Sequence, residues 1–495
     1  MNRLASLFLR ASLLALAGLL LLASDAAAIV PVKPRPPVPF SSVLPYLLLG
    51  VAVLALVSYL VWRAMRVLAR RLDERGIRRP ILTSALLFAA GVAVPVLVMA
   101  SPLCRRARAA KPPAPPADTA GAWPTFMGGA ARTGCAPGAR GPAQGKMLWA
   151  FSDAKSPAAF SASPTLAGGR IYVGSDNCKL YCLDARTGQA VWEFKAACEI
   201  FASPVVADGR VFAAEGMHQA NAAKLYCLDA ATGTPEWSFP TTSHIEFSPT
   251  LFEGKLYFGA GGDGVYCVDP KTGRQLWRHP GVHVDMPPAV TPGRVVFGSA
   301  YGEPAFYAVD PSDGKLLWKR PTPLPVCGTP STDGDRFYCG IGNGNFQDSH
   351  AQPKGAVWCL SLADGSVVWT REVKDAVLSA VALADGSAYF GSRDGHLYCV
   401  DAKSGQPRWS FKTEDAVVSS PAVASGRVYF GSNDGHVYCL DAARGSLIWK
   451  YDTSGATLLN DARVMASPVV GDGRIFVGSL NCCFFCLGEA AEQTP

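Results

Sequence analysis

The sequence predicts an all-β fold: an eight-bladed β-propeller of four-stranded antiparallel blades, closed by an N-terminal strand and preceded by a two-helix transmembrane hairpin. Three observations support this fold class. Tryptophan recurs with a spacing of about 40 residues over the last two thirds of the chain. Each repeat contains four short apolar runs separated by glycine-containing turns. Two apolar stretches without charge precede the repeats. The recurring residues, to which we assign a structural role, are Trp149, Trp192, Trp237, Trp277, Trp318, Trp369, Trp409 and Trp449.

The repeats share one pattern, which residues 419–453 show clearly. Runs rich in Val, Tyr, Ile and Trp alternate with Ser-Gly, Asp-Gly and Arg-Gly turns, as in antiparallel hairpins. Asp441 is placed to accept backbone N–H bonds in the following turn, where Gly445 can adopt the left-handed conformation. Trp449 then lies on the outer strand as an apolar plate against the next blade. Four strands in a repeat of this length indicate a propeller blade.

The number of repeats indicates a closed ring of eight blades. The strand of Tyr-Cys-Leu-Asp type occurs eight times, the last time at Phe485, and the tryptophan strand also occurs eight times. Trp149 has no Tyr-Cys-Leu-Asp strand before it, and Phe485 has no tryptophan strand after it. We therefore expect residues 147–151 to form the outer strand of the last blade. This pairing would leave no open sheet edge.

Three features relate the chain to a known family. They are the repeat Leu-Asp-Ala-x-Thr-Gly-x-x-x-Trp, the eightfold count, and the segment WPTFMGGAARTG at residues 123–134. Together they resemble the PQQ-like β-propeller repeat family of the WD40/YVTN-like quinoprotein superfamily. The resemblance covers about residues 123–488, and it is closer to the barrel-assembly lipoproteins of the outer membrane than to the quinoprotein dehydrogenases. It is specific for the fold and much less so for an activity.

The N-terminal quarter has the composition of targeting and membrane segments. Arg3 and Arg10 precede an apolar run and three alanines at 26–28, as in a secretory signal peptide. Two later apolar runs are each long enough to cross a bilayer. We expect this order of segments: a signal peptide (1–28), a Pro-rich linker (29–43), two transmembrane helices (44–62 and 81–103) with a basic loop within 44–104, a linker (105–122), the propeller (123–488) and a tail (489–495).

Charge predicts the orientation and excludes one class of partner. The loop between the two apolar runs contains seven arginines but only two acidic residues, Asp73 and Glu74. This loop is therefore expected in the cytoplasm, where it would contact anionic lipid of the inner membrane. The propeller is then expected on the periplasmic or extracytoplasmic side of the inner membrane. Residues 1–122 carry 15 basic and 4 acidic side chains, which leaves 31 and 35 for residues 123–495. A mildly acidic propeller disfavours nucleic-acid binding.

Most of the 15 cysteines are expected to be buried thiols. Seven occupy the second position of the Tyr-Cys-Leu-Asp strand, where blade four has Ala308. Packed sheets lie about 10 Å apart, which exceeds the Cα separation of about 7 Å that a disulfide tolerates. A bridge between Cys178 and Cys482, and a vicinal bond between Cys482 and Cys483, remain open. The sequence leaves the pairing of eight cysteines unassigned: Cys104, Cys135, Cys178, Cys198, Cys327, Cys339, Cys482 and Cys483.

One face of the propeller is the candidate binding face. The turns between the second and third strands of blades two and five carry insertions, at 215–223 and 341–356, and the longest linker between blades, 454–466, opens on the same side. Loops on a rigid scaffold commonly bind ligands. No metal site is predicted, because Pro280 and Gly281 interrupt the spacing of His279 and His283. The candidate residues are Glu199, His218, His244, Glu246, His283, Asp285, Asn343, Asn345, Asp348, His350, Asn460, Asp461 and Arg463.

The sequence favours a binding scaffold for an envelope protein, polymer or other ligand over an enzyme, and it indicates no catalytic residue. The alternative function is a membrane-bound alcohol or sugar dehydrogenase that depends on PQQ and calcium, cofactors expected only under that alternative. The resemblance implies that such an enzyme holds a planar quinone on an aromatic floor beside a calcium ion bound by carboxylate and amide oxygens. The blades here are lean and carry two modest insertions, which argues against this pocket.

Overall fold

The computed structural model describes residues 123–135, 138–218, 220–456 and 461–489. The chain divides into two units, residues 1–109 and 110–495, and every described residue belongs to the second. The predicted signal peptide, linkers and transmembrane helices, the tail beyond Glu489, and candidate residue Asn460 lie outside the described residues. Within the described ranges, no helix is long and apolar enough to cross a membrane. Two short 3₁₀ helices are present, η1 (Phe126–Gly128) and η2 (Ser454–Ala456).

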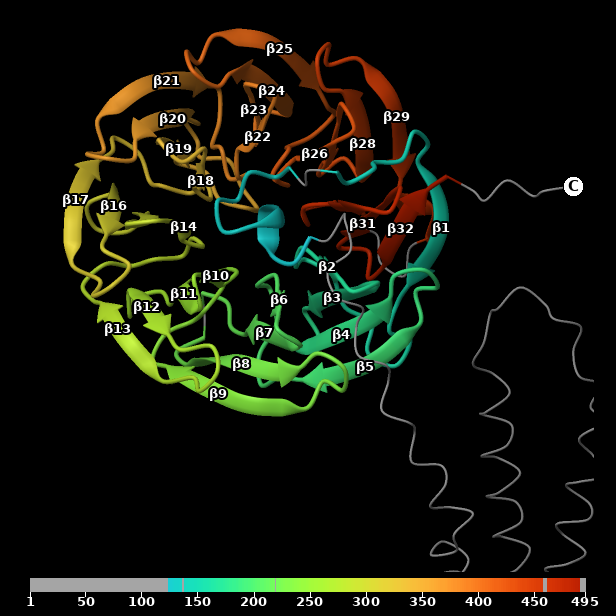
Figure 1. Cartoon of the computed structure of the whole chain (residues 1–495). Coiled ribbons are helices and arrows are strands. Elements are labelled where there is room, and N and C mark those ends of the chain that lie inside the picture. Colours follow the sequence, from blue (N-terminus) through green and yellow to red (C-terminus); the bar gives the residue numbers. More distant parts are fainter. Residues whose placement is uncertain (1–122, 136–137, 219, 457–460, 490–495) are drawn as a thin grey trace, which may run out of the picture. The chain divides into compact units, whose positions relative to one another are not determined.

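The described residues form eight four-stranded antiparallel sheets, which are the blades of a propeller (Figure 1). Blade one contains β2 (Thr165–Ala167), β3 (Arg170–Ser175), β4 (Lys179–Asp184) and β5 (Ala190–Lys195). Blade two contains β6 (Val205–Ala207), β7 (Arg210–Ala214), β8 (Ala223–Asp229) and β9 (Pro235–Thr241). Blade three contains β10 (Thr250–Phe252), β11 (Lys255–Gly259), β12 (Val265–Val268) and β13 (Gln275–His279). Blade four contains β14 (Ala289–Thr291), β15 (Arg294–Ser299), β16 (Ala305–Val309) and β17 (Leu316–Pro321).

The second half of the ring repeats this arrangement. Blade five contains β18 (Ser331–Thr332), β19 (Arg336–Gly342), β20 (Gly355–Ser361) and β21 (Val367–Val373). Blade six contains β22 (Ala382–Ala384), β23 (Ser387–Ser392), β24 (His396–Asp401) and β25 (Pro407–Lys412). Blade seven contains β26 (Ala422–Ala424), β27 (Arg427–Gly431), β28 (His436–Asp441) and β29 (Leu447–Asp452). Blade eight contains β30 (Val469–Gly471), β31 (Arg474–Gly478), β32 (Phe484–Gly488) and β1 (Lys146–Phe151). The predicted eight-bladed, all-β fold is confirmed.

The Asp–Gly–Trp spacing joins each blade to the next. In blade six, Asp401 Oδ1 accepts N–H bonds from Lys403 (3.1 Å) and Ser404 (2.9 Å), which shapes the turn before β25. Trp409 on β25 then packs over Gly445 of blade seven, where an added Cβ would lie 2.5 Å from the indole. The indole N–H of Trp409 donates to Ala442 O at 3.1 Å. Glycine is required at this position both by its φ of +69° and by the tryptophan above it.

An N-terminal strand closes the ring, as the repeat count predicts. Strand β1 pairs antiparallel with β32, and Trp149 faces Cys486 across the ladder. Trp149 also packs over Gly188 of blade one and donates its indole N–H to Ala185 O at 3.2 Å. Blade eight therefore makes the same contact with blade one that blades one to six make with their successors, and each of the eight described sheets has a paired outer strand. In blade seven, Trp449 instead packs over Gly145, just before β1.

Residues 123–135 and 138–140 form a segment that we call the central strap, because its helix η1 lies at the centre of the ring in Figure 1. Its backbone carbonyls accept N–H bonds from the innermost strands of five blades and from the turn after β30 of blade eight, and Trp123 forms a further bridge with Leu166 of blade one. The six pairs are Pro124 with Val206, Ala130 with Val290, Ala131 with Thr332, Thr133 with Leu383, Gly134 with Val423 and Arg140 with Gly473. The strap thus fixes seven of the eight blades through its backbone.

The remaining blade, blade three, is held by a side chain. Arg132 is fully buried, and its guanidinium donates to Pro288 O (3.2 Å), Ser248 O (3.2 Å) and Thr250 Oγ1. Thr250 lies on β10, the innermost strand of blade three. Burial lowers the pKa of Arg132 to about 9, so the side chain remains cationic at neutral pH. This buried cation, bonded to carbonyl and hydroxyl oxygens, links the strap to blade three, the one blade that the described part of the strap does not reach through its backbone.

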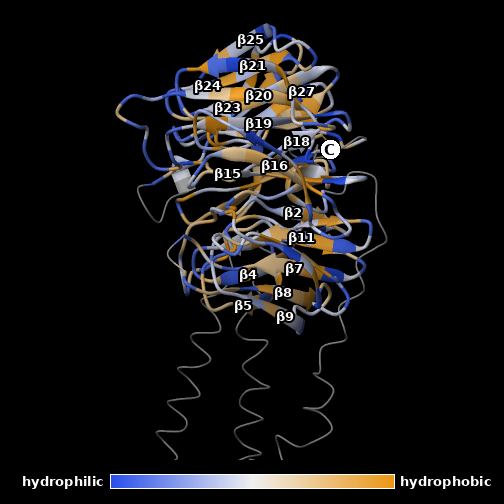
Figure 2. Ribbon diagram, turned by 90° about the vertical axis from the view of Figure 1, so that its left-hand side faces the viewer, coloured by the Kyte–Doolittle hydropathy of each residue, from blue (hydrophilic) through white to orange (hydrophobic). Residues whose placement is uncertain are grey.

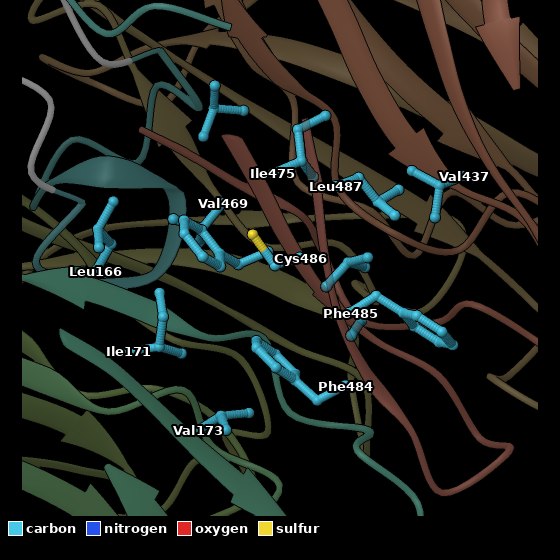
Figure 3. Packing of buried hydrophobic residues seen from close by; sticks show 14 of the residues in the cluster. Leu166, Ile171, Val173, Val437, Val469, Ile475, Phe484, Phe485, Cys486 and Leu487 are labelled. Carbon is cyan, nitrogen blue, oxygen red and sulfur yellow. The ribbon is translucent and has the colours of Figure 1, made fainter. Parts of the chain in front are cut away.

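Apolar side chains fill the spaces between the blades. Figure 2 shows hydrophobic residues concentrated on the strands and hydrophilic residues on many of the connecting loops. Figure 3 shows one cluster, in which Ile171 and Val173 of blade one lie near Phe484 of blade eight. The 14 described cysteines are free, and those of the Tyr-Cys-Leu-Asp strands are buried, as predicted. Cys178 and Cys482 form no bond with each other, and neither do Cys482 and Cys483.

Substitution of Arg132 tests the strap. We predict that Arg132→Met lowers the free energy of unfolding by about 2–4 kcal/mol, because the buried carbonyl of Ser248 loses its guanidinium donor and that of Pro288 loses one of two donors. Arg140→Met is the matched control, since the side chain of Arg140 is exposed on the same strap. Urea unfolding followed by tryptophan fluorescence measures both changes. Equal stability of Arg132→Met and the unmodified chain would contradict a role for this residue in holding the ring.

Candidate functional site

Two kinds of connection meet on one face of the ring, which we call the loop face: the turns between the second and third strands, and the linkers between blades. Glu215, in the turn after β7, accepts N–H bonds from Ala197 (2.7 Å) and Cys198 (3.1 Å) in the linker after β5. Similar contacts join His218 of that turn to residues of the linkers after β9 and β13. The side chains of these loops are therefore brought together from blades that are separate in sequence.

A small cavity lies in the central channel beneath the loop face. Its volume is ≈ 50 Å³, and it is lined by serines and apolar residues, with Phe126 of the strap at one end. Phe346 reaches into it from the insertion of blade five, and its ring centroid lies 6.2 Å from that of Phe247 and 6.4 Å from that of Phe201. Since Phe201 and Phe247 belong to linkers of blades one to three, Phe346 crosses the channel mouth.

The serines of this channel hold the blades together. Four of the six serines that line the cavity accept a backbone N–H bond from the neighbouring blade or linker through the hydroxyl oxygen, at distances of 2.8 to 3.0 Å. The pairs are Ser203 N–H with Ser248, Ala380 N–H with Ser420, Ser420 N–H with Ser467 and Ser467 N–H with Ser163. A buried backbone N–H without such a partner is costly, so these hydroxyls have a structural role.

The channel lining does not fit a quinone and a calcium ion. Calcium is bound by six to eight oxygen ligands, several of them carboxylates, and no carboxylate is among the residues that line this cavity. A volume of ≈ 50 Å³ is also far below the ~300–1,000 Å³ of typical small-molecule sites. We therefore derive no reaction through PQQ or calcium.

Two of the predicted residues in the insertion of blade five, Asn343 and Asn345, hold the shape of the loop. The side chain of Asn343 accepts an N–H bond from Lys354 and donates to Gln352 O, each at 2.8 Å. Asn345 Oδ1 accepts N–H bonds from Gln347 (2.8 Å) and Asp348 (2.7 Å). These predicted site residues therefore stabilise the turn of the loop itself.

Arg393 anchors this insertion to blade six. Its guanidinium donates to Asn345 O at 2.8 Å, to Gln347 O at 3.1 Å and to Ser349 Oγ at 3.3 Å. His350 bonds only within its own turn, where its Nδ1 accepts the N–H of Gln352 at 3.1 Å. Asp348, like His350, has an exposed side chain on this loop. The loop is thus held at the channel mouth with several of its polar groups free to meet a partner.

Two further candidate residues, Asp461 and Arg463, pair with each other. Arg463 Nη2 lies 2.6 Å from Asp461 Oδ2, and this bond raises the pKa of the arginine. The negative charges of Asp415 and Asp348 act on Arg463 in the same direction, so the pair lies near the insertion of blade five. Neither residue contacts the histidines on the other side of the face that the structure describes.

Five predicted residues form one cluster, which we call the histidine cluster. Asp285 lies at its centre: His283 Nε2 is 2.8 Å from Asp285 Oδ1, His244 Nε2 is 2.9 Å from the same oxygen, and His218 Nε2 is 3.4 Å from Oδ2. Glu246 contacts the other ring nitrogen of His218 through its Oε2. His218 belongs to the turn after β7, the pair His244 and Glu246 to the linker after β9, and the pair His283 and Asp285 to the linker after β13.

The histidine cluster combines buried and accessible groups. The side chains of His244 and Asp285 are 5% and 4% exposed, whereas those of His218 and His283 are 47% and 28% exposed. The carboxylates of Asp285 and Glu246, which lie close to its ring nitrogens, raise the pKa of His218 to about 11. Burial acts to raise the pKa of Asp285, but the three histidines outweigh it and hold that pKa well below its ordinary value. The two carboxylates thus favour a positive charge at this position.

Glu199, the remaining predicted residue, acts on a different carboxylate of the loop face. Asp176, in the turn after β3, has a partly buried side chain, and its Oδ2 accepts a bond from Ser161 Oγ at 3.0 Å. Burial raises the pKa of Asp176 to about 6; the bond from Ser161 opposes the increase, and the charge of Glu199 adds to it.

Several residues of the loop face were missed by sequence reasoning. Phe201, Phe247 and Phe346 line the channel mouth, but an isolated phenylalanine in a loop gives no signal of its position. Tyr301, in the turn after β15, lies against the histidine cluster, with its ring centroid 4.4 Å from that of His283. Phe201 and Phe247 stand two residues and one residue before a Ser-Pro pair that precedes the inner strand of the next blade, and this repeated placement is a signal that could have found them.

Comparison with known proteins gives a consistent family. The sequence model described as "Outer membrane protein assembly factor BamB" matches residues 138–280, 217–303, 261–349 and 353–481, which together are more than half of the chain. Proteins of that name match short stretches: the protein from Salmonella typhimurium is 35% identical over 72 residues, and that from Moranella endobia is 39% identical over 87 residues. These stretches are 13% and 15% of this chain and 18% and 22% of the relatives, so the chain spans about a fifth of the length of the curated relatives it matches.

Solved structures agree on the fold. BamB from Moraxella catarrhalis superposes with a TM-score of 0.55 at 16% identity, over 71% of this chain and 99% of that protein. Quinohemoprotein alcohol dehydrogenase from Comamonas testosteroni superposes with a TM-score of 0.60 at 15% identity, over 79% of this chain and 83% of that enzyme. At such identities the likeness concerns the propeller alone. The predicted resemblance to the PQQ-like repeat family, on its outer-membrane assembly side, is confirmed.

The predicted localisation in the inner membrane is wrong. The matched relatives from three organisms and a matched structure are all named BamB, the curated ones as outer membrane assembly factors. The prediction was based on two apolar runs and the arginines between them. The length of an apolar run and the charge beside it indicate whether a segment suits a bilayer. They do not indicate which membrane of the cell that bilayer belongs to. The lipid of the inner membrane, predicted as a partner, has no support either.

The raised pKa of Asp176 predicts a pH dependence of stability. Because the folded-state value of about 6 exceeds the ordinary 3.8, the contribution of this group is fully present below pH 3.8 and is lost as the pH rises through 6. Asp176→Asn removes this loss. We predict that the free energy of unfolding of the variant, relative to the unmodified chain, increases by up to about 3 kcal/mol between pH 4 and pH 7.

Urea unfolding at both pH values measures this change. Asp335→Asn is the control, because Asp335 has an exposed side chain in another turn, and its relative stability should stay constant. If the stability of Asp176→Asn relative to the unmodified chain does not rise with pH, the carboxyl group of Asp176 is not held in an environment that favours its neutral form.

Proposed function

This chain belongs to the family of outer membrane protein assembly factor BamB, and from that membership we propose that it is a protein-binding scaffold that acts in outer-membrane assembly. The observation that carries the proposal is that the family's repeats make up the ring itself, since the match extends from residue 138 to residue 481 with one short interruption. Function in the envelope requires export, and residues 1–28 have the composition of an export signal.

The loop face supports the binding of another envelope protein. A closed ring of eight blades gives a rigid base, and loops on such a base present binding groups without a large ordering cost. The insertion of blade five carries exposed polar residues at its tip and is anchored by Arg393 and Phe346. We propose that this insertion is the part of the loop face that contacts the partner protein.

The dehydrogenase alternative receives no specific support. The structural similarity to an alcohol dehydrogenase concerns the propeller, which hosts many activities. The lining of the channel lacks the carboxylate ligands that a quinone–calcium site requires. We therefore keep the scaffold as the proposed function.

Photo-crosslinking tests the proposed contact. A photoreactive residue placed at Gln347, whose side chain is exposed at the tip of the insertion, should crosslink to a defined envelope protein in cells. The same residue at Lys271, exposed in a turn after β12, is the control. We predict that Arg393→Ala weakens the crosslink about tenfold, because the loop then has to be ordered on binding, whereas Arg444→Ala leaves it unchanged.

The same strains allow a functional readout. Arg393→Ala should reduce the amount of folded outer-membrane β-barrel proteins, measured by their heat-modifiable migration in gels, while Arg444→Ala should not. A chain that crosslinks equally from Gln347 and Lys271, or cells whose β-barrel proteins fold normally without the chain, would refute the proposed function.

A further inference from the structure

We propose that the histidine cluster is a zinc site, in which His218, His244, His283 and Asp285 are the ligands and Glu246 holds His218 in position. Three imidazoles and one carboxylate are a donor set typical of zinc, which prefers four nitrogen, oxygen or sulfur ligands. The two carboxylates of the cluster also balance the charge of a divalent cation. The ligands come from the loop face, from the inserted turn of blade two and from the linkers before and after blade three.

The spacing of the ligand atoms suits a tetrahedral metal. With bonds of about 2.0–2.1 Å to nitrogen and oxygen, the ligands of a tetrahedral zinc ion lie about 3.3 Å apart. Asp285 oxygens lie 2.8 Å, 2.9 Å and 3.4 Å from the Nε2 atoms of His283, His244 and His218. The groups His244–His283–Asp285 and His218–His244–Glu246 each have ligand atoms within 4.8 Å of one another. Three of the proposed ligands, His244, His283 and Asp285, are therefore already grouped closely enough to surround one ion. His218, whose Nε2 lies 3.4 Å from Asp285 Oδ2, would complete the set by a larger movement of its half-exposed side chain.

Two close contacts within the histidine cluster, between His283 and Asp285 and between Glu246 and His218, involve a buried polar atom that has no hydrogen-bond partner. His283 Nε2 is 2.8 Å from Asp285 Oδ1, yet it forms no hydrogen bond. Glu246 Oε2 likewise contacts His218 without one, although the side chain of Glu246 is buried. Buried polar atoms are nearly always satisfied in folded proteins. Polar atoms that lie close together but do not bond one another are expected where they face a common cation.

The surroundings of the ligands resemble those of metal sites. A metal-binding imidazole usually donates its second ring N–H to a carboxylate, which fixes its orientation. Glu246 occupies this position on His218, since it contacts Nδ1 while Nε2 faces Asp285. Buried His244 and Asp285 form the base of the site, and the partly exposed His218 and His283 leave it open to solvent for metal uptake.

A bound ion would join three segments that the backbone leaves separate. His218 lies in the inserted turn of blade two, while the other ligands lie in the linkers on either side of blade three. Zinc would clamp this turn to the linkers and fix one side of the loop face. The inference does not depend on the proposed function, because the residues that test partner binding lie in blades five and six and those that test zinc lie in blades two to four.

Zinc binding to the full-length chain, purified without a histidine tag, tests the proposal. After incubation with ZnCl₂ and removal of free metal, we expect one equivalent of zinc by elemental analysis and a higher midpoint of thermal unfolding. Asp285→Asn and His244→Ala should lose the bound zinc. Glu246→Gln should weaken binding 10- to 100-fold, as loss of a carboxylate that orients a ligand does. Substitution by Co²⁺ should give the visible absorption of a four-coordinate site in the unmodified chain only.

Controls separate this site from other metal-binding groups. His350→Ala and Cys198→Ala remove a histidine and a partly exposed cysteine that lie outside the cluster, and both variants should keep one equivalent of zinc. His283→Gln is a milder substitution that keeps the fold testable if His244→Ala unfolds. Absence of stoichiometric zinc, or equal zinc content in the unmodified chain and in both Asp285→Asn and His283→Gln, would overturn the proposal and leave the cluster as a set of histidine–carboxylate ion pairs.

Discussion

Closure of the ring is the constraint on which the rest of the structure depends. A blade can bury its two apolar faces only between two neighbours, so the first and last blades must meet. Strand β1 achieves this by pairing with β32, and Trp149 then covers Gly188 of blade one as its counterparts do elsewhere. The central strap, which lies just before β1 in the sequence, bonds the inner strands at the same time. The 29 residues from Trp123 to Phe151 thus fasten the ring at its centre and at its seam.

This closure also determines where chemical groups meet. His218, His244 and His283 come from three connections that are about 25 to 40 residues apart, and only the fixed angle between neighbouring blades brings their rings within contact distance. Phe346 similarly reaches Phe201 and Phe247 across the channel. A ring with an open seam would let these blades move apart, so the histidine cluster and the channel mouth both require the closed form.

The sequence predicts the blades better than the site, for physical reasons. The spacing of Asp441, Gly445 and Trp449 is local, and each residue acts within its turn or on the adjacent blade, so the repeat was readable directly. The loop face could also be assigned from the insertions, and five of its predicted residues lie together. Their convergence could not be predicted, because it depends on distances between blades. Arg132 carried no signal either, since a lone arginine near the start of the propeller gives no indication that it will be buried against blade three.

Hydrogen exchange at the seam tests the account most directly. If β1 closes the ring, the amides of β32 should exchange as slowly as those of β28, the equivalent strand of blade seven. Ala150→Pro, which breaks the β1–β32 ladder, should speed exchange in β32 by about 100-fold or more while blade three changes much less. Fast exchange of β32 in the unmodified chain, or protection of β32 that Ala150→Pro leaves intact, would contradict closure by this strand.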